Sequence, residues 1–174
     1  MNMEALIVYK SKYGHTKQVA EWLAAELNAK AFDFNEIEFK VLEQAKTIVY
    51  AAGIYASGFD LPKEIIEQVN KNLIILITGA SDPKETDYSE LYTKNFPTEF
   101  KEKVKIFHIQ TGINYKKLSF GHKILMRLIR GSFRREYEKN PSKDLSYVLE
   151  NYLDEYDFSK KEDVLEIADY VRKL

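Results

Sequence analysis

The chain has 174 residues, with 45% hydrophobic and 30% charged side chains, which is typical of a folded globular protein and excludes a disordered or fibrous chain. Its 26 lysines and arginines almost balance its 27 acidic residues, so nucleic-acid binding by bulk positive charge is excluded. The chain contains no cysteine, which excludes disulfides, thiolate metal sites and a cysteine nucleophile.

Four short apolar runs along the chain predict β-strands. They span residues 5–9, 47–52, 73–78 and 104–109, and a weaker alternating run at 31–34 predicts an edge strand. The first three of the strong runs are continuously apolar, which indicates strands that are buried on both faces of a parallel sheet.

Amphipathic patterns between these runs predict helices. Residues 16–27 and 61–70 each place their apolar side chains on one face, and Pro62 fits the first turn of the second helix. Ser159 and Glu162 have capping-box spacing and precede a final amphipathic helix. Strands and helices therefore alternate, and we expect one α/β domain over residues 1–174.

Targeting and metal-binding signals are absent from the sequence. The first residues carry no basic segment followed by a long apolar run, and no apolar stretch approaches the roughly 20 residues of a spanning helix. A cytoplasmic location is therefore expected. The three histidines show no ligand spacing, so no metal site is expected, and His108 reads as a core or sheet-edge histidine.

Four of the seven glycines lie just after the predicted strong strands. They are Gly14, Gly53, Gly79 and Gly112. Ligands of open parallel sheets bind outside the carboxyl ends of the strands, where glycine permits tight turns and close approach of the backbone to a ligand. The alternative is that these glycines only end strands.

The loop after the first strand has the features of an anion site. It leads directly into the helix predicted at 16–27, whose first N–H groups and positive dipole end attract an anion. Ser11 and Thr16 offer hydroxyl donors, and Gly14 lets the backbone curl. Neither a P-loop nor a G-x-G-x-x-G dinucleotide fingerprint is present, and an ordinary capped turn is the alternative.

The segment YKSKYGHT, residues 9–16, resembles the FMN phosphate loop of flavodoxin-like proteins, and its S-x-Y-G-H part is similar to the loop of flavodoxin-like quinone oxidoreductases. This resemblance implies a flavodoxin-like three-layer α/β sandwich, with a five-stranded parallel sheet in 2-1-3-4-5 order and helices on both faces. It also implies FMN as the cofactor. The implied phosphate-binding residues are Ser11, Lys12, Tyr13, Gly14, His15 and Thr16.

The same resemblance implies further contacts with FMN from the later loops. The loop after the strand at 47–52 would lie against the isoalloxazine ring, with Tyr55 and Phe59 as stacking candidates; alternatively, both only pack this loop onto the next helix. The implied residues of this loop are Gly53, Ile54, Tyr55, Ala56 and Ser57. The weaker candidates in later loops are Thr78, Gly79, Gly112 and Tyr115.

The segment 116–135 contains seven basic residues and no acidic residue. Its helical part, residues 118–135, would place the basic side chains on one side and Leu118, Leu125, Leu128 and Ile129 on another. Such a helix fits an anionic membrane surface or an acidic partner. The alternatives are an ordinary solvated helix face and pairing with the acidic segment 150–157, and we favour this pairing over peripheral membrane contact.

Residues 107–115, followed by 120–130, resemble the later half of the flavodoxin-like protoporphyrinogen oxidases, which bind FMN and pass electrons from protoporphyrinogen to a quinone at the membrane. The chain departs from that pattern after Arg135, in a stretch at 136–158 rich in tyrosine and acids. The resemblance implies an FMN-dependent oxidoreductase whose redox partner is a quinone, a porphyrinogen or a redox protein. A flavodoxin-type electron carrier and a flavin-less interaction scaffold are the alternatives.

Overall fold

The computed structural model describes residues 3–55, 58–84, 86, 88, 89, 93, 97 and 103–174. The chain divides into two compact units. The first unit consists of Met1–Thr111 together with Ser159–Leu174, and the second is Gly112–Phe158.

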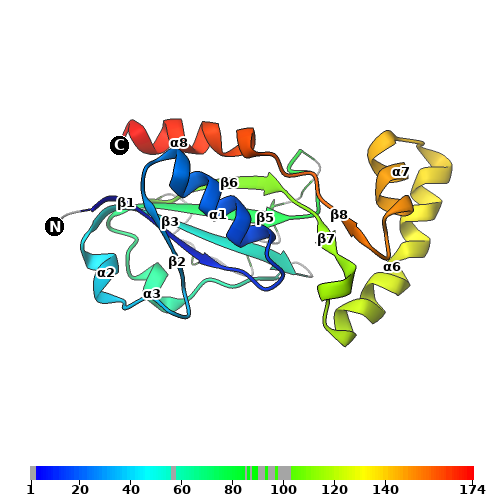
Figure 1. Ribbon diagram of the computed structural model, residues 1–174, viewed down its shortest axis with the longest axis horizontal. Helices are drawn as coiled ribbons and strands as arrows, with labels where there is room; N and C mark the ends of the chain where they lie inside the picture. Colours follow the sequence, from blue (N-terminus) through cyan, green and yellow to red (C-terminus); the bar gives the residue numbers. More distant parts are fainter. Residues whose placement is uncertain are drawn as a thin grey trace. The chain divides into compact units, whose positions relative to one another are not determined.

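The first unit is built on a parallel sheet whose strand order is β2-β1-β3-β5-β6 (Figure 1). These strands are β1 (Met3–Lys10), β2 (Lys30–Asp33), β3 (Ala45–Tyr55), β5 (Asn72–Gly79) and β6 (Lys105–Gln110). Counted along the chain, this is the 2-1-3-4-5 order, so the predicted fold is confirmed. The continuously apolar runs form the three central strands, in which residues such as Ile7, Val49 and Ile75 have no exposed surface.

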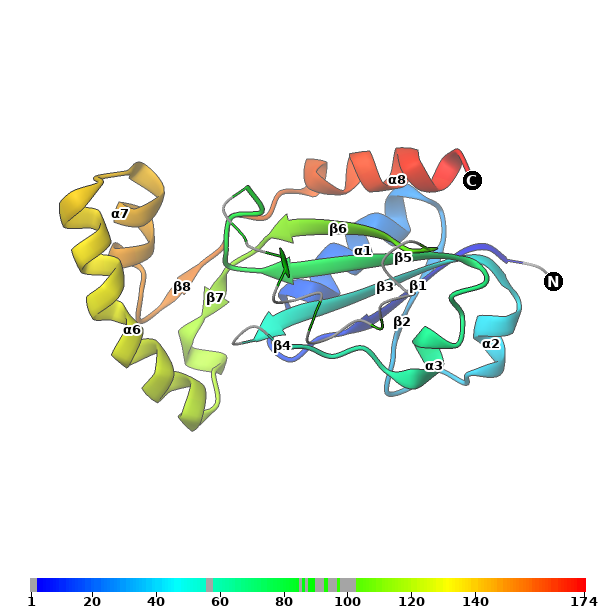
Figure 2. The same cartoon turned by 180° about the vertical axis from the view of Figure 1, so that it is seen from behind.

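Helices cover both faces of this sheet (Figures 1 and 2). One face packs against α1 (His15–Glu26), η2 (Lys161–Val164) and α8 (Leu165–Arg172). The other packs against α2 (Lys40–Glu43) and α3 (Lys63–Ile66). The helix predicted at 61–70 is therefore much shorter than expected, because after Ile66 the chain continues in tight turns such as that between the Val69 amide and the Ile66 carbonyl.

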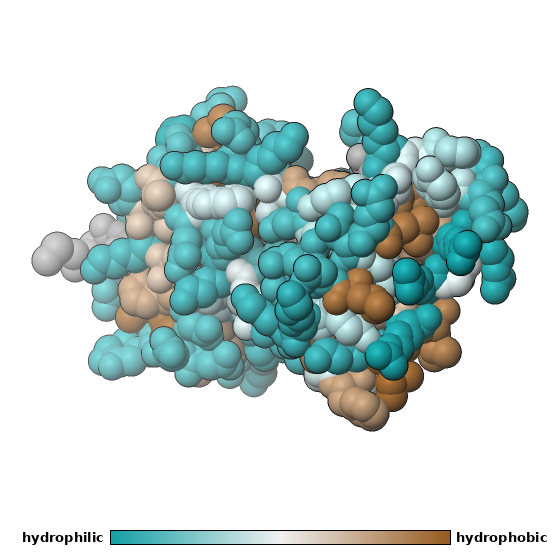
Figure 3. Space-filling view, turned by 45° about the vertical axis from the view of Figure 1, so that its right-hand side comes forward, coloured by the Kyte–Doolittle hydropathy of each residue, from teal (hydrophilic) through white to brown (hydrophobic). Residues whose placement is uncertain are grey.

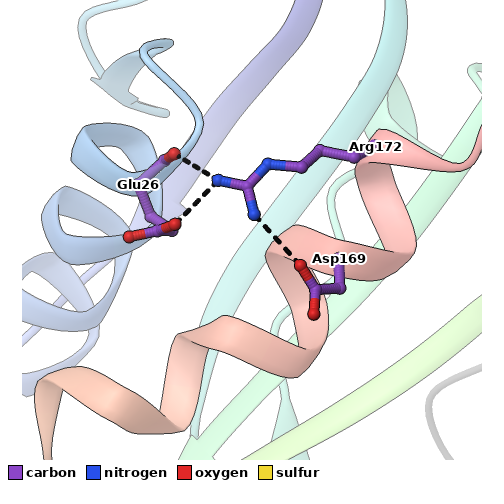
Figure 4. A network of polar contacts seen from close by, with 3 residues as sticks. All are labelled: Glu26, Asp169 and Arg172. Carbon is purple, nitrogen blue, oxygen red and sulfur yellow. Dashed lines mark hydrogen bonds and ion pairs between the residues drawn. The ribbon is translucent and has the colours of Figure 1, made fainter.

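The last helix is joined to the first by one arginine (Figure 4). Arg172 of α8 forms an ion pair with Glu26 of α1 at 2.7 Å, donates a hydrogen bond to its backbone carbonyl at 2.8 Å, and contacts Asp169 at 3.0 Å. The predicted capping box at Ser159 is displaced by one residue, since the Asp163 carboxylate accepts the bond from the Lys160 amide at 2.7 Å. These contacts fix the chain terminus over the sheet.

The second unit is a helical hairpin closed by two short antiparallel strands. Its elements are β7 (Ile113–Asn114), η1 (Tyr115–Lys117), α6 (Phe120–Lys139), α7 (Lys143–Glu150) and β8 (Glu155–Tyr156). Tyr152 is 1% exposed, and its hydroxyl donates to the Met126 carbonyl of α6. Burial raises the pKa of Tyr152 to about 12. The unit therefore has its own small core around this tyrosine.

The buried side of α6 differs from the predicted one. Leu118 and Met126 are buried and Ile129 is half-buried, whereas Leu125 and Leu128 are exposed, so only part of the expected apolar face is packed. The reason is that Met126, with its carbonyl bound by Tyr152, faces the core of the unit.

Among the residues that the structure describes, the favoured pairing of the basic segment with residues 150–157 is seen at Lys116. Lys116 does bind Asp154 at 2.6 Å. Three other basic side chains instead contact tyrosines. Lys123 lies over the Tyr115 ring, Arg127 donates to the Tyr115 hydroxyl at 3.1 Å, and Arg130 lies over the Tyr152 ring. Because tyrosine is neutral, these contacts do not neutralise the positive charges of Lys123, Arg127 and Arg130.

Candidate cofactor-binding site

The loop between β1 and α1 is shaped by a glycine at the start of the helix. Gly14 has φ 106° and ψ −28°, a backbone conformation that side chains with a Cβ rarely adopt. Its amide donates to the Ser11 hydroxyl at 3.2 Å, and its carbonyl accepts from the Gln18 amide at 3.0 Å. Gly14 thus turns the chain from the end of β1 directly into α1.

The charges around this loop favour an anion. Residues 10–18 include three lysines and no acidic residue, and the first turn of α1 has no acidic side chain. The helix N-terminus adds unpaired N–H groups and a positive dipole end. Lys10 and Lys17 have their own partners, Asp60 at 2.5 Å and Glu21 at 3.8 Å. A phosphate is therefore matched by backbone N–H groups, hydroxyls and nearby positive charge.

Two buried threonines connect this loop to the end of β5. The hydroxyls of Thr16 and Thr78 lie 2.8 Å apart, and the side chains are 3% and 2% exposed. The Thr78 hydroxyl also donates to the Ala52 carbonyl within β3 at 3.4 Å. The sequence pattern singled out both threonines, but it gave no sign that they bond to each other. These contacts join β5 and β3 to the first turn of α1.

The segment after residue 52 is a strand and a hairpin rather than the predicted loop. Gly53, Ile54 and Tyr55 belong to β3, which pairs antiparallel with β4 (Gly58–Phe59). Phe59 is 5% exposed and packs edge-on against Tyr50, so its interpretation as a stacking residue is wrong and the packing alternative holds. Ala56, Ser57 and the Tyr55 side chain lie outside the described part of the chain.

The Tyr50 hydroxyl holds the base of this hairpin. It donates to the Asp60 carbonyl at 2.9 Å, and burial raises the pKa of Tyr50 well above its usual range. Lys10, at the end of β1, pairs with the carboxylate of the same Asp60 at 2.5 Å. The hairpin is thereby fixed beside the loop that leads into α1.

His108 of β6 places a buried ring nitrogen under the ends of β3 and β5. Its Nδ1 lies 2.7 Å from the Tyr88 hydroxyl, and its Nε2 is buried with no hydrogen-bond partner among the residues that the structure describes. A Cβ built on Gly79 would lie 3.7 Å from this Nε2 and 3.7 Å from the Ile54 Cβ. An unsatisfied polar atom at this place is a group that a ligand at the strand ends could satisfy.

Burial lowers the pKa of His108 to about 4, from 6.5 in an unperturbed side chain. Between these values the unfolded chain binds a proton that the folded chain does not, so the free energy of unfolding should fall as the pH drops from 6.5 to 4 and level off below. We expect wild type to lose up to about 1.4 kcal/mol per pH unit relative to His108→Asn. Urea unfolding of both proteins at several pH values measures this, and parallel curves would contradict it.

The remaining two candidates are Gly112 and Tyr115, which belong to the second unit. Contacts within that unit explain why a glycine and a tyrosine occupy these positions. A Cβ on Gly112 would lie 1.6 Å from the Tyr156 carbonyl oxygen, so this glycine permits close approach of β7 and β8. Tyr115 is 9% exposed, its amide donates to the Asp154 carbonyl, and its hydroxyl accepts from Arg127. Contact of either residue with a cofactor remains a prediction.

A parallel sheet in this order, with a glycine turn that leads from its first strand directly into its first helix, has the topology of a flavodoxin-like protein. The model of the flavodoxin domain family matches residues 6–140, and the chain belongs to this family. No relative was found among curated protein sequences.

Solved structures with a similar fold are distant in sequence. An archaeal flavodoxin is 14% identical in sequence, and the alignment covers 98% of this chain and 99% of the flavodoxin, with a TM-score of 0.44. The two-electron reduced flavodoxin of Megasphaera elsdenii is 10% identical, and its alignment covers 61% of this chain and 83% of the flavodoxin, with a TM-score of 0.41. A flavoprotein of Lactobacillus acidophilus NCFM in complex with FMN is 12% identical, and its alignment covers 62% of this chain and 92% of the flavoprotein, with a TM-score of 0.40.

Proposed function

We propose that the chain binds FMN and serves flavin-mediated electron transfer. The observation that carries this proposal is the loop at Ser11–Thr16, where Gly14 turns the backbone into the N-terminus of α1 beside the ends of β3 and β5. Backbone N–H groups of this turn and the hydroxyls of Ser11 and Thr16 would hold the phosphate. Membership in the flavodoxin domain family supports the same cofactor.

The residues at the strand ends fit the ring part of the cofactor. Gly53 and Ile54 of β3 and Gly79 of β5 would lie near its polar edge, and the buried His108 Nε2 would accept or donate a hydrogen bond there. The bound flavin would supply the redox chemistry, while these groups orient it and tune its potential. Tyr88 would keep the His108 ring in one orientation through the bond to Nδ1.

Within this role, we favour an oxidoreductase over a carrier. The basic segment 116–135 supports this choice, because carriers that dock on a protein partner are generally strongly acidic, whereas this chain has a formal charge of −1. The proposed redox partner is a quinone or a porphyrinogen, as in the flavodoxin-like protoporphyrinogen oxidases that residues 107–115 and 120–130 resemble. Turnover of either compound by the flavin-loaded protein tests this proposal, and reduction of a redox protein without such turnover would favour the carrier.

The cofactor proposal is tested by comparing three flavins. FMN carries the phosphate, riboflavin lacks it, and FAD extends it with a bulky nucleotide. If the Ser11–Thr16 loop holds the phosphate, FMN should bind at least about a hundredfold more tightly than riboflavin, since each hydrogen bond to a charged group contributes about 1.5–3 kcal/mol. Fluorescence titration measures this ratio. Equal affinities for FMN and riboflavin, or recovery of FAD from the purified protein, would refute the proposal.

A further inference from the structure

An exposed row of large apolar side chains runs along the first half of α6. Phe120, Ile124 and Leu128 are 81%, 45% and 74% exposed, and we call these three residues the apolar stripe. They are spaced by four residues, so each is displaced by only about 40° around the helix from the one before it. Figure 3 shows brown and tan side chains along the lower edge of this part of the molecule. The stripe is therefore a continuous surface and not a set of scattered residues.

Positive charge borders the stripe. On one side of the stripe, the helical repeat of α6 places three basic residues about 20–60° from Phe120 around the helix axis: Lys123, Arg127 and Arg134. Arg135 lies near the far end of the stripe. No acidic residue occurs between positions 116 and 135. Lys123 and Arg127 contact the neutral Tyr115, and Arg134 pairs with Glu138 at 3.6 Å. The surface thus combines exposed apolar groups with a net positive border.

We propose that this surface binds the headgroup layer of an anionic lipid membrane, with α6 lying parallel to the membrane plane. The three apolar side chains would enter the acyl boundary, while the long lysine and arginine side chains would reach the phosphates beside them. In the part of the chain that the structure describes, no helix is long and apolar enough to span a bilayer, so contact by this helix would be peripheral.

Charge and shape favour a lipid surface over two other occupants. A second copy of the chain would bring two positive borders together, which costs free energy. An acidic protein would match the charge, but the apolar stripe lies on a convex helix face, which suits a deformable bilayer and needs a matching groove in a protein partner. Both occupants give distinct results in the experiment below.

The experiment is cosedimentation of the full chain with vesicles of phosphatidylcholine alone or with 30% phosphatidylglycerol, a composition on the order of that of anionic natural membranes. Binding should require the anionic lipid and fall with added salt. Phe120→Ser with Leu128→Ser should lower the partition coefficient about tenfold or more. Arg134→Gln with Arg135→Gln should lower it about twenty-five-fold, since each basic side chain near such a surface contributes about fivefold.

Matched controls are available in the first unit. Leu165→Ser with Leu174→Ser removes two apolar side chains that are 44% and 41% exposed, and Lys63→Gln with Lys173→Gln removes two exposed charges. Both controls should bind as wild type does. No binding to anionic vesicles, equal binding to neutral ones, or stripe-dependent self-association in the ultracentrifuge would overturn the proposal. Vesicle binding is measured both with and without added FMN. Failure of the cofactor proposal would therefore leave this test of the membrane proposal unaffected.

Discussion

An alanine at position 112 should disrupt the second unit and leave the first unit folded. The added Cβ would lie 1.6 Å from the Tyr156 carbonyl oxygen, 2.4 Å from its carbonyl carbon and 2.5 Å from the Asp157 Cα. All three atoms belong to the backbone, which cannot rotate away as a side chain can. Because Ile113 pairs with Tyr156 in the β7–β8 ladder, relief of the clash requires these strands to separate. We expect a loss on the order of 3 kcal/mol.

Hydrogen exchange of the Gly112→Ala protein measures this effect, because it reports the two units separately. Faster exchange should be confined to residues 113–156. Gly121→Ala is the matched control, since a Cβ there meets no atom within 4 Å and alanine favours the helix in which it lies. It should leave exchange unchanged or slightly slower. Similar acceleration by both substitutions would show that the approach of β7 to β8 does not require glycine.

The fold of the first unit follows from the sequence because its signals are strong and local. Three continuously apolar runs became the buried strands β1, β3 and β5, and Gly14 marked the start of α1. The length of β3 could not be predicted in the same way. Its extension to Tyr55 depends on antiparallel pairing with Gly58–Phe59, and Phe59 is fixed by burial against Tyr50, a contact that no local pattern reveals.

The contacts of the basic side chains in the second unit and the position of His108 could not be predicted from the sequence, for a related reason. The basic pattern of α6 was clear, but its partners are Tyr115 and Tyr152, and a neutral ring gives no charge signal in the sequence. His108 likewise shows no motif. Its place near the strand ends depends on the sheet register, which pairs it with Ile77, and on the Tyr88 hydroxyl, which bonds to its Nδ1. Long-range packing decides both cases.

The Thr16–Thr78 hydroxyl pair permits a test that separates structural support from phosphate binding. Thr16→Val keeps the shape of the side chain but leaves the Thr78 hydroxyl buried with only the Ala52 carbonyl at 3.4 Å. We expect a loss of about 1–2 kcal/mol in the free energy of unfolding, because an unsatisfied buried hydroxyl costs about that much. The same substitution removes a proposed phosphate donor, so the affinity for FMN should fall at least about tenfold.

Thr78→Val and the double variant complete the cycle. Thr78→Val should cost similar stability but retain most of the FMN affinity, because the Thr16 hydroxyl remains in the loop. The double variant should regain much of the stability, since replacing both partners of a buried hydrogen bond with apolar groups is close to neutral. Its FMN affinity should stay as low as that of Thr16→Val. If FMN affinity recovers together with stability, Thr16 acts only through packing, and the phosphate must be held by the backbone of the Ser11–Thr16 loop alone.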